Sequence, residues 1–356
     1  MSAVLSIAFL EQTDSTMDFT SFSTETGKRL SAPTPEINVS VCVLNWNDPV
    51  RLRGCLQSLR DVKALNDVNY EVIVIDNGST DSSRELVLNE FPLVRLVALP
   101  QNIALAAAYN QGLRLGRGRF LVILNNDIVV LDDCLSRMAR FLTEDSTAGI
   151  VVARLLDPNG SVQERYYLCK LPSLRSLFAE LSWLDRIWPN NPWGHKAGAR
   201  GWDPDKIFQM EQVPGAAMMV KREVVERVGL LDEGFRFGYE DVDFCNRCGK
   251  AGWTLWYLPD ARVVHYGGAS VAMMESRDTS LFRFRGLLRY SQKYFTPRQY
   301  FILRLLVAGI LVLRLPVVFA LELWPKASVR TRWKGTHRVY LRLFWESLTA
   351  TTRVAC

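Results

Sequence analysis

Short apolar runs alternate with helical patterns through the first third of the chain. The runs lie at residues 39–44, 71–75, 94–98 and 120–124, and each has the length of a strand. After the first run, Asp48 and Pro49 are typical of a helix start, and the next apolar residues share one helical face: Leu52, Cys55, Leu56 and Leu59. This alternation predicts an α/β fold with a mostly parallel, Rossmann-like sheet and flanking helices.

Polar residues at the ends of these runs predict a ligand site. Asn45, Asp76 and Asp127 follow the first, second and fourth runs. Because the carboxyl ends of parallel strands meet at one edge of an α/β sheet, we expect these side chains to lie together there. At that edge the Asp127 carboxylate can hold a hard cation that carries phosphates. The same residue can equally well cap a turn, and the local sequence FLVILNND at 120–127 does not separate the two.

A dinucleotide site is an alternative, because an Asp after the second strand can bind a ribose. However, no G-x-G-x-x-G follows the first run, where residues 45–49 read NWNDP. The phosphates of a ligand must then be neutralised in another way, and a divalent cation at Asp127 is the available means. The pattern therefore favours a nucleotide-sugar site over a dinucleotide site.

The C-terminal part of the chain has a different pattern. Residues 301–324 are almost wholly apolar and would extend about 36 Å as a helix, enough to cross a bilayer. At 100° per residue, however, Arg304, Arg314 and Glu322 fall within an arc of about 80°, and Pro316 interrupts the run. These features favour an amphipathic helix in the membrane interface, with a spanning helix as the alternative.

Charge adds to this picture. The net charge of the 356 residues is +6, but residues 277–356 hold 15 Lys and Arg against 3 acids, a local charge of +12. Interleaved with aromatic residues, this basic segment suits an anionic membrane surface. Nucleic acid is the rival partner, but no recognised nucleic-acid module accompanies the segment, so we expect no nucleic-acid partner.

Three further features concern the rest of the chain. The first 36 residues are rich in Ser, Thr and Glu, which predicts a flexible leader, and they show no secretory signal. Seven irregularly spaced cysteines indicate reduced thiols in a cytoplasmic setting, and we interpret Cys245 and Cys248 as packing residues rather than a metal site. Four Trp residues between positions 166 and 202 could contact an acceptor sugar or a membrane interface, or belong to a packed insertion.

Six blocks of sequence together resemble glycosyltransferase family 2, especially its bacterial rhamnosyltransferase-like branch. They are VCVLNWN at 41–47, IDNGSTD at 75–81, NIALAAAYNQG at 102–112, LNND at 124–127, VPGAAMMVKREVVERVGLLDEGF at 213–235, and YEDVDFCNR at 239–247 with HYGGAS at 265–270. The resemblance implies a GT-A domain at 37–275. From the apolar and basic patterns described above, we expect residues 276–356 to form a helical membrane-associating tail. Two positions depart from the family pattern: Ala104 replaces a glycine, and Asn125, Asn126 and Asp127 replace D-x-D.

The resemblance also implies a donor site and a metal site. Asp76 would bind the nucleobase, and the other expected donor contacts are Asn45, Trp46, Gly78, Asn102 and Asn126. Asn45 and Trp46 could instead simply end a strand. Asp127 and His265 would bind a divalent cation, Mg²⁺ or Mn²⁺, that stabilises the diphosphate leaving group. Taken without its motif, His265 would be read as a core or surface residue.

The acceptor hydroxyl is a poor nucleophile, so a carboxylate must remove its proton as the new bond forms. By the resemblance this base is Asp241, which the helix N-terminus would keep ionised. Glu240 would orient the acceptor and Gly215 would allow its close approach. A base opposite the leaving group implies inversion at the anomeric carbon. Without the motif, Asp241 would belong to an acidic helix start with an Asp243 to Arg247 ion pair.

We therefore expect an inverting, metal-dependent glycosyltransferase of cell-surface polysaccharide biosynthesis. By resemblance, it would move rhamnose from dTDP-rhamnose to a lipid-linked glycan at the cytoplasmic face of the inner membrane, as a peripheral or monotopic protein. One alternative is a sugar nucleotidyltransferase on a related sheet, which attacks phosphorus and does not need Asp241. The other is a catalytically silent glycan-binding or scaffold protein.

Overall fold

The computed structural model of the chain describes residues 38–65, 67–167, 170–182, 184–188, 191–194, 202–267, 276–325 and 334–349. These residues belong to one compact unit. The predicted leader at 1–36 and the predicted domain boundary at residue 275 lie outside the described residues.

The first part of the chain alternates strand and helix, as its apolar pattern predicts. The elements are β1 (Val39–Asn45), α1 (Pro49–Asp61), β2 (Tyr70–Asp76), α2 (Ser83–Glu90), β3 (Arg95–Ala98), α3 (Leu105–Leu115) and β4 (Phe120–Asn125). The Asp48 side chain accepts a hydrogen bond from the backbone N–H of Arg51 at 3.1 Å, and Pro49 occupies the first turn of α1. The predicted N-cap and helix start are confirmed.

The next elements complete the sheet. They are β5 (Ile128–Val130), α4 (Cys134–Glu144), β6 (Ala148–Leu156), α5 (Leu174–Leu181), α6 (Leu184–Ile187), β7 (Phe208–Met210), β8 (Ala217–Lys221), α7 (Arg222–Val228), α8 (Glu240–Lys250) and β9 (Thr254–His265). Among the described residues the strand order is β3-β2-β1-β4-β8-β6-β9-β5, with β7 paired to β9. Two short 3-10 helices lie at Val62–Leu65 and Glu164–Tyr166.

The sheet is mixed rather than mostly parallel. Strands β3, β2, β1 and β4 are parallel to one another, but β8 is antiparallel to both β4 and β6, and β5 and β7 are antiparallel to β9. The prediction of parallel pairing depended on a helix between successive strands, but β5 follows β4, and β8 follows β7, without an intervening helix. Among the described strands, β6 and β9 form one further parallel pair.

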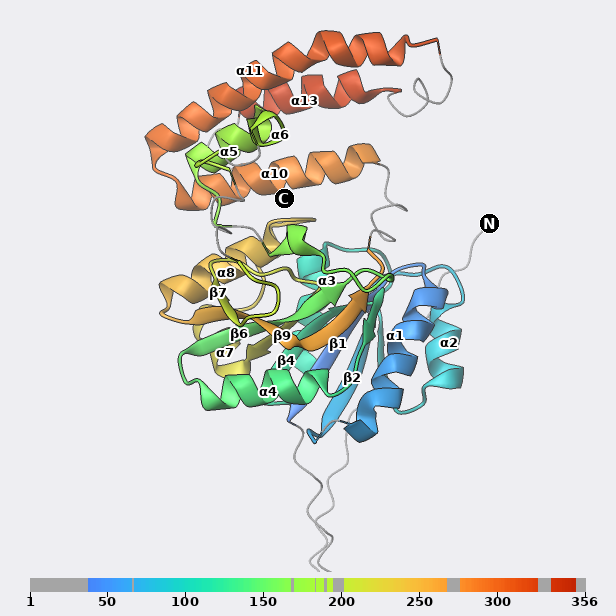
Figure 1. The fold of residues 1–356 in the computed structure, drawn as a ribbon. Coiled ribbons are helices and arrows are strands. Elements are labelled where there is room, and N and C mark those ends of the chain that lie inside the picture. The colour runs from blue at the N-terminus through green and yellow to red at the C-terminus, as the bar shows by residue number, and fades with distance from the viewer. Residues whose placement is uncertain are drawn as a thin grey trace, which may run out of the picture. The chain divides into compact units, whose positions relative to one another are not determined.

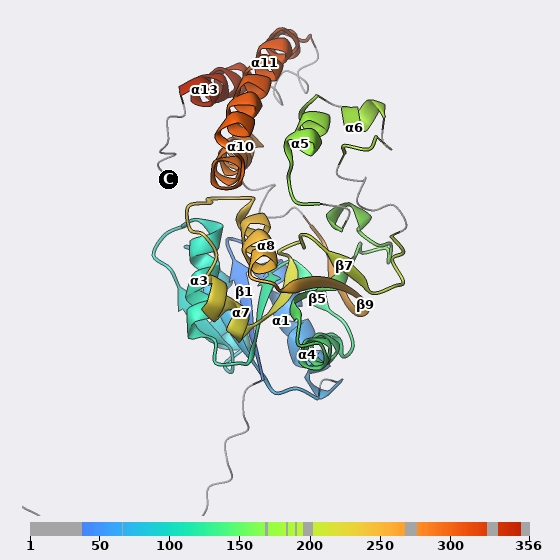
Figure 2. The ribbon, with the colours of Figure 1, turned by 90° about the vertical axis from the view of Figure 1, so that its left-hand side faces the viewer.

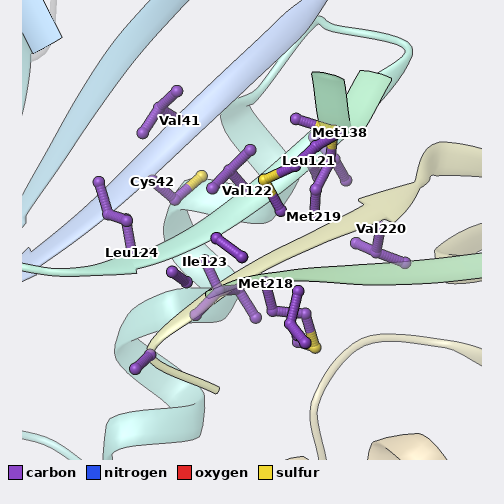
Figure 3. Close-up of a cluster of buried hydrophobic side chains, with 14 of the residues drawn as sticks. Val41, Cys42, Leu121, Val122, Ile123, Leu124, Met138, Met218, Met219 and Val220 are labelled. Atoms are coloured by element: carbon purple, nitrogen blue, oxygen red, sulfur yellow. The ribbon is translucent and has the colours of Figure 1, made fainter. Parts of the chain in front are cut away.

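Helices cover both faces of the sheet. Figure 2 shows α3, α7 and α8 on one side of it and α1 and α4 on the other. Figure 3 shows the core between β1, β4 and β8, with residues 121–124 and 218–220 beside Val41, Cys42 and Met138. All these side chains are buried, and full burial of such a side chain contributes about 1.5–3 kcal/mol to folding.

The C-terminal helices are α10 (Ser276–Tyr294), α11 (Pro297–Glu322) and α13 (Thr336–Thr349). Together with α5 they form a second apolar cluster, which we call the helical group; Figure 1 shows these helices beside one another. Among the described residues, α11 is the one helix that is long and apolar enough to cross a membrane, by length and composition alone. It continues through Pro316, so the prediction that this proline interrupts the run was wrong.

The polar arc of α11 faces the protein. Arg304 donates hydrogen bonds to the carbonyls of Ser347 (2.6 Å) and Leu348 in the last turn of α13, whereas Glu322 accepts from the backbone N–H and ring of His337 in its first turn, at 2.9 and 2.6 Å. Both charges complement the dipole of α13. Arg314 donates to the carbonyl of Leu181 at the end of α5, at 2.6 Å. The charged arc is therefore occupied by contacts within the protein, and the placement of this helix in a membrane interface stays a prediction.

The outer side of α11 is apolar. Its exposed large side chains include Phe301, Ile302, Leu305, Val312, Leu313, Val317, Phe319 and, just past its end, Leu323 and Trp324. They lie on the helix whose charged residues pair with α5 and α13. The helical group thus presents apolar surface to its surroundings.

The predicted packing residues are largely confirmed. Cys245 and Cys248 are fully buried free thiols, as are the other cysteines among the described residues. Trp202 stacks on Tyr167 at a centroid distance of 5.9 Å, whereas Trp188 and Trp193 are exposed. The Trp-rich segment therefore combines a packed part with an exposed part, and Trp183 lies outside the described residues.

Candidate active site

The register of the parallel strands brings the predicted polar residues to one edge of the sheet. Asn45 at the end of β1 pairs with Asp76 at the end of β2, and Leu44 pairs with Asn125 at the end of β4. The buried Asn45 side chain accepts a hydrogen bond from the amide of Asn126 at 2.7 Å. The structure thus brings together the strand ends that were expected to meet, while the roles of these residues stay predictions.

Asp76 is held by the turn that follows β2. Its Oδ1 accepts hydrogen bonds from the backbone N–H of Ser79 at 3.1 Å and from Arg84 Nε at 2.6 Å. Its Oδ2 is buried and has no hydrogen-bond partner among the described residues. This oxygen is therefore available to an N–H of a ligand. Arg84 was missed in the sequence, because an arginine in the first turn of a helix is ordinarily solvated.

Gly78 allows two loops to approach each other. Its φ is +76°, and a Cβ there would lie 2.4 Å from the backbone nitrogen of Asn102. Asn102 itself is exposed, and its loop is anchored by Asn77, whose side chain bonds both the carbonyl and the N–H of Ile103, at 3.0 and 2.9 Å. Trp46 is partly exposed at the same edge. The sequence motif pointed to Gly78 and Asn102 but missed the anchoring role of Asn77.

The candidate metal residues meet because β5 pairs with β9. His265 is the register partner of Ile128, and the N–H of Tyr266 donates to the carbonyl of Asp127 at 3.0 Å. The distance from His265 Nε2 to Asp127 Oδ1 is 3.6 Å, and both side chains are buried. Asp127 Oδ1 has no hydrogen-bond partner among the described residues. A buried carboxylate oxygen in this situation is costly unless a cation or proton lies next to it.

The chemistry of this pair fits a divalent cation. Carboxylate oxygen suits Mg²⁺ and Mn²⁺, and imidazole nitrogen is a common metal ligand. The described residues contain no cluster of three or more His, Cys, Asp or Glu side chains that could bind a metal ion. Of the described residues, Asp127 and His265 would supply two ligands, and phosphate oxygens could occupy further coordination positions.

The predicted acceptor residues lie at the start of α8. Gly238 and Tyr239 both have positive φ, of +80° and +74°, and this turn leads directly into Glu240 and Asp241. The Asp241 carboxylate accepts hydrogen bonds from the backbone N–H groups of Val242 at 2.8 Å and Gly215 at 3.3 Å. Gly215 therefore contacts Asp241 directly, which the sequence did not reveal.

Burial dominates the electrostatics of these two carboxyl groups. Burial and the neighbouring Asp241 charge raise the pKa of Glu240 to about 8. Burial also raises the pKa of Asp241, although its two backbone hydrogen bonds act in the opposite direction. The expectation that the helix N-terminus governs the ionisation of Asp241 thus accounted for the smaller of two opposing effects.

A short path of contacts connects the two halves of the site. The N–H of Asn125 donates to the carbonyl of Ala216 at 3.0 Å, and Ala216 follows Gly215. The Tyr109 hydroxyl donates to Asn125 Oδ1 at 2.8 Å from α3. Asn125 therefore lies between the loop of Asp127 and the loop that contacts Asp241.

The remaining acidic residue of the motif has a structural role. Asp243 is fully buried and accepts from Arg247 Nε at 2.9 Å, as its i,i+4 spacing predicts. It also accepts from Lys293 Nζ at 2.5 Å and from the Tyr294 hydroxyl at 2.7 Å, both in α10. Lys293 and Tyr294 lie about 50 residues from Asp243 along the chain, so no local sequence pattern predicts these contacts.

Parts of the chain match known proteins in sequence. Residues 40–205 match the family model Glycosyl transferase family 2. An N-acetylglucosaminyl-diphospho-decaprenol L-rhamnosyltransferase of Mycobacterium tuberculosis is 27% identical over 211 residues, and this match covers 55% of the chain and 66%, just under two thirds, of that protein. The dTDP-rhamnosyl transferase RfbF of Shigella flexneri is 22% identical, over 64% of the chain and 69% of its own length.

A solved structure also resembles this one. The crystal structure of GalNAc-T7 with UDP, GalNAc and Mn²⁺ superposes with a TM-score of 0.52 at 14% sequence identity, over 89% of this chain and 58% of that chain. At this identity the likeness shows the fold alone. The fold is thus of the GT-A type, as the sequence motifs implied.

Proposed function

We propose that the chain is a member of glycosyl transferase family 2, whose model matches residues 40–205, and that it transfers a sugar from a nucleotide-diphosphate donor to a lipid-linked glycan, with inversion at the anomeric carbon. The observation that carries this proposal is the buried pair of Asp127 Oδ1 and His265 Nε2, 3.6 Å apart. This pair lies at the sheet edge that also holds Asn45 and Asp76.

The donor nucleotide occupies the edge formed by β1 and β2. Asp76 Oδ2 accepts a hydrogen bond from the nucleobase, since it is buried and has no other partner among the described residues. Asn45 and Asn126, joined by their side-chain hydrogen bond, line the ribose side. Trp46, Gly78 and Asn102 complete this half of the site, and the close approach at Gly78 fixes the position of the Asn102 loop.

Asp127 and His265 hold a Mg²⁺ or Mn²⁺ ion against the diphosphate. When bound, the ion acts as a Lewis acid that stabilises the charge developing on the leaving nucleoside diphosphate. The two side chains exclude water from this position because both are buried. Their burial keeps the electrostatic interactions within the site strong.

Asp241 acts as the general base. As the acceptor hydroxyl oxygen forms its bond to the anomeric carbon, Asp241 takes the hydroxyl proton, and the bond from carbon to the diphosphate breaks with its electron pair. The raised pKa of Asp241 makes it a better proton acceptor than an exposed aspartate. Glu240 donates or accepts a hydrogen bond to the acceptor, and Gly215 fixes the position of the base through its N–H.

Two relatives support the choice of substrates. Both are rhamnosyltransferases by name, one acting on a decaprenol-linked sugar and the other using a dTDP-linked donor. We therefore assign dTDP-rhamnose as the donor and a lipid-linked glycan as the acceptor, in cell-surface polysaccharide biosynthesis.

A lipid-linked acceptor requires access to a membrane, and we assign this contact to residues 276–356. The exposed apolar side chains of α11 enter the interface, and the basic residues of the tail contact anionic headgroups at the cytoplasmic face. Because Arg304, Arg314 and Glu322 pair within the helical group, the apolar side of α11 does not carry their charges into the lipid.

A donor screen tests the proposal. Purified full-length protein is incubated with a panel of nucleotide sugars, Mg²⁺ or Mn²⁺ and a polyprenyl-diphosphate-linked sugar, and the products are separated by mass. We expect release of nucleoside diphosphate and extension of the lipid-linked sugar by one residue, abolished by a chelator. Release of pyrophosphate would indicate a nucleotidyltransferase instead, and no turnover with any donor would support a silent binding protein.

A further inference from the structure

The hydrogen bonds of His265 identify a residue that the proposed metal site needs and that the sequence motifs do not contain. Gln163 lies just beyond β6 and is buried. Its Oε1 lies 2.8 Å from His265 Nδ1, while its Nε2 lies 2.7 Å from Asp157 Oδ1 and 2.7 Å from the carbonyl oxygen of His265. The amide thus contacts three polar groups at once.

These contacts fix the orientation of the Gln163 amide. Asp157 Oδ1 and the His265 carbonyl are acceptors, so each must face an N–H, and the amide nitrogen has two N–H bonds to give. A flipped amide would place its oxygen against both acceptors. The oxygen of Gln163 therefore faces His265 Nδ1, and as a pure acceptor it requires that Nδ1 carry a proton.

The backbone around Gln163 is held as firmly as its side chain. Its N–H donates to the carbonyl of Leu155 at 2.9 Å, across a tight hairpin in which Gly160 has a φ of +86°. Asp157, at the start of the hairpin, accepts from the Ser161 hydroxyl at 3.1 Å through its second oxygen. Parallel pairing of β6 and β9 sets Leu156 beside Val264, next to His265. The hairpin therefore holds the Gln163 side chain against His265 in a single position.

We propose that Gln163 is a positioning residue, which holds His265 in the Nδ1–H form so that Nε2 presents its lone pair toward Asp127. This inference rests on the proposed function, since it assigns Nε2 and Asp127 Oδ1 to one cation. A histidine ligand that donates its other N–H to a fixed acceptor has its ring orientation and its basicity set by that acceptor. Asp157 acts indirectly, because it fixes the Gln163 amide, which in turn fixes the His265 ring.

Imidazole ¹⁵N NMR of the full-length protein without metal tests the tautomer directly. The chain has three histidines, so the spectrum is small, and His265→Ala identifies the resonance pair of interest. At slightly alkaline pH, we expect the wild type to show a protonated Nδ1 and an unprotonated Nε2. Gln163→Leu should shift His265 toward the Nε2–H form, because Nδ1 loses its acceptor.

Measurement of metal affinity tests whether the tautomer of His265 affects cation binding. We expect Gln163→Leu to bind Mn²⁺ in the presence of dTDP about 10- to 100-fold more weakly than the wild type, as measured by calorimetry or by electron paramagnetic resonance of free Mn²⁺. The matched control is Gln209→Leu, which makes the same change at an exposed position of β7, a strand also paired to β9. This control should bind Mn²⁺ like the wild type.

A double variant separates positioning from folding. Asp157→Asn combined with Gln163→Glu reverses one hydrogen bond, because the new amide can donate to the new carboxylate, which still accepts from Nδ1–H. The double variant still lacks the amide N–H that bonds the His265 carbonyl. We therefore expect it to restore the Nδ1–H form but to recover the Mn²⁺ affinity only in part. Restoration would also show that weak binding by Gln163→Leu does not arise from misfolding.

The outcomes distinguish this inference from the proposed function. Unchanged tautomer and unchanged Mn²⁺ affinity in Gln163→Leu, with binding by the wild type, would overturn the role of Gln163. If the wild type binds no Mn²⁺ with dTDP, the metal site itself is wrong, and the NMR comparison still decides whether Gln163 sets the tautomer of His265.

Discussion

At the scale of single residues, Glu240 and Asp241 acquire different properties from their surroundings. Glu240 Oε2 is buried and has no hydrogen-bond partner among the described residues, whereas Asp241 accepts two backbone N–H bonds. With its pKa raised to about 8, Glu240 holds its proton at neutral pH, whereas the two backbone N–H bonds to Asp241 oppose the effect of burial on the pKa of that group. The neighbouring carboxyl groups can therefore act as a hydrogen-bond donor and a base.

The first prediction concerns the base. Asp241→Asn keeps the size of the side chain but cannot accept a proton, so the rate of transfer at saturating donor should fall by about 10²- to 10⁴-fold. Donor affinity should change little, because Asp241 contacts Gly215 and not the strand edge of Asp76. Single-turnover transfer to a lipid-linked acceptor measures both. A rate within a few-fold of the wild type would place the base elsewhere.

The second prediction concerns the stability cost of Glu240. Its folded-state pKa of about 8 lies above the ordinary value of 4.5, so the unfolded chain releases this proton at lower pH than the folded protein does. The contribution of Glu240 to folding stability is then lost as pH rises from about 4.5 to about 8. Glu240→Gln stays neutral throughout and should unfold at a higher temperature than the wild type at pH 8, with the difference vanishing toward pH 4.5.

Thermal unfolding at the two pH values checks this prediction. Glu240→Gln should thus stabilise the protein at pH 8 but weaken sugar transfer, which is a trade-off between stability and activity. Equal unfolding temperatures at pH 8 would show that Glu240 is not held protonated by its surroundings.

At the scale of elements, α8 connects the active site to the helical group. Its first turn carries Glu240 and Asp241. Asp243, two residues after Asp241, contacts Lys293 and Tyr294 of α10. Lys293 also forms an ion pair with Asp232. Burial alone would raise the pKa of Asp232, but hydrogen bonds from Lys293 and Arg289 lower this pKa to about 2. These charges attach α10 to the sheet side of the protein.

The third prediction tests this attachment. Asp243→Asn leaves Lys293 and Arg247 without their fully buried countercharge, so the free energy of unfolding should fall by about 3 kcal/mol. Urea denaturation measures it, with Asp260→Asn, an exposed aspartate of β9, as the matched control. A loss no larger than that of the control would mean that α10 is held by apolar contacts alone.

The elements show what the sequence could and could not predict. The strands β1 to β4 and the start of α1 follow from local apolar patterns and a cap, since these interactions join residues close in the chain. Antiparallel pairing of β8 was not predictable, because β8 lies beyond a long segment without helix–strand alternation.

The site divides in the same way. Asn45, Asp76 and Asp127 follow from strand ends, and Asp241 and His265 from motifs. Gln163 was missed: a buried glutamine has no periodic signature, and its role depends on where β6 meets β9. Likewise, the sequence showed that the three charges of α11 share one arc but did not reveal their partners at Leu181, Ser347 and His337, which come from elsewhere in the chain.

At the scale of the whole molecule, the exposed side of α11 determines the fourth prediction. Leu313 is 77% exposed although it lies in an otherwise apolar helix. If this side enters a membrane interface, Leu313→Asn should weaken binding to vesicles that contain phosphatidylglycerol by about tenfold, the effect of losing one buried leucine. Vesicle flotation measures it.

The matched control is Leu93→Asn, which removes a still more exposed leucine, 94% accessible, between α2 and β3. This variant should float like the wild type. High salt or alkaline carbonate should release part of the protein, since charge contacts at the surface are screened. Complete retention under carbonate would instead support a helix that spans the bilayer.

The hydrogen bonds of α11 also set an order of events during synthesis. Arg314 needs the carbonyl of Leu181, which emerges 133 residues earlier, whereas Arg304 needs Ser347, which emerges 43 residues later. The charges on α11 are therefore satisfied only after α13 has left the ribosome, when every strand of the sheet has already been made. The contacts of the helical group are therefore completed after the described strands of the sheet and the candidate active-site residues have been synthesised.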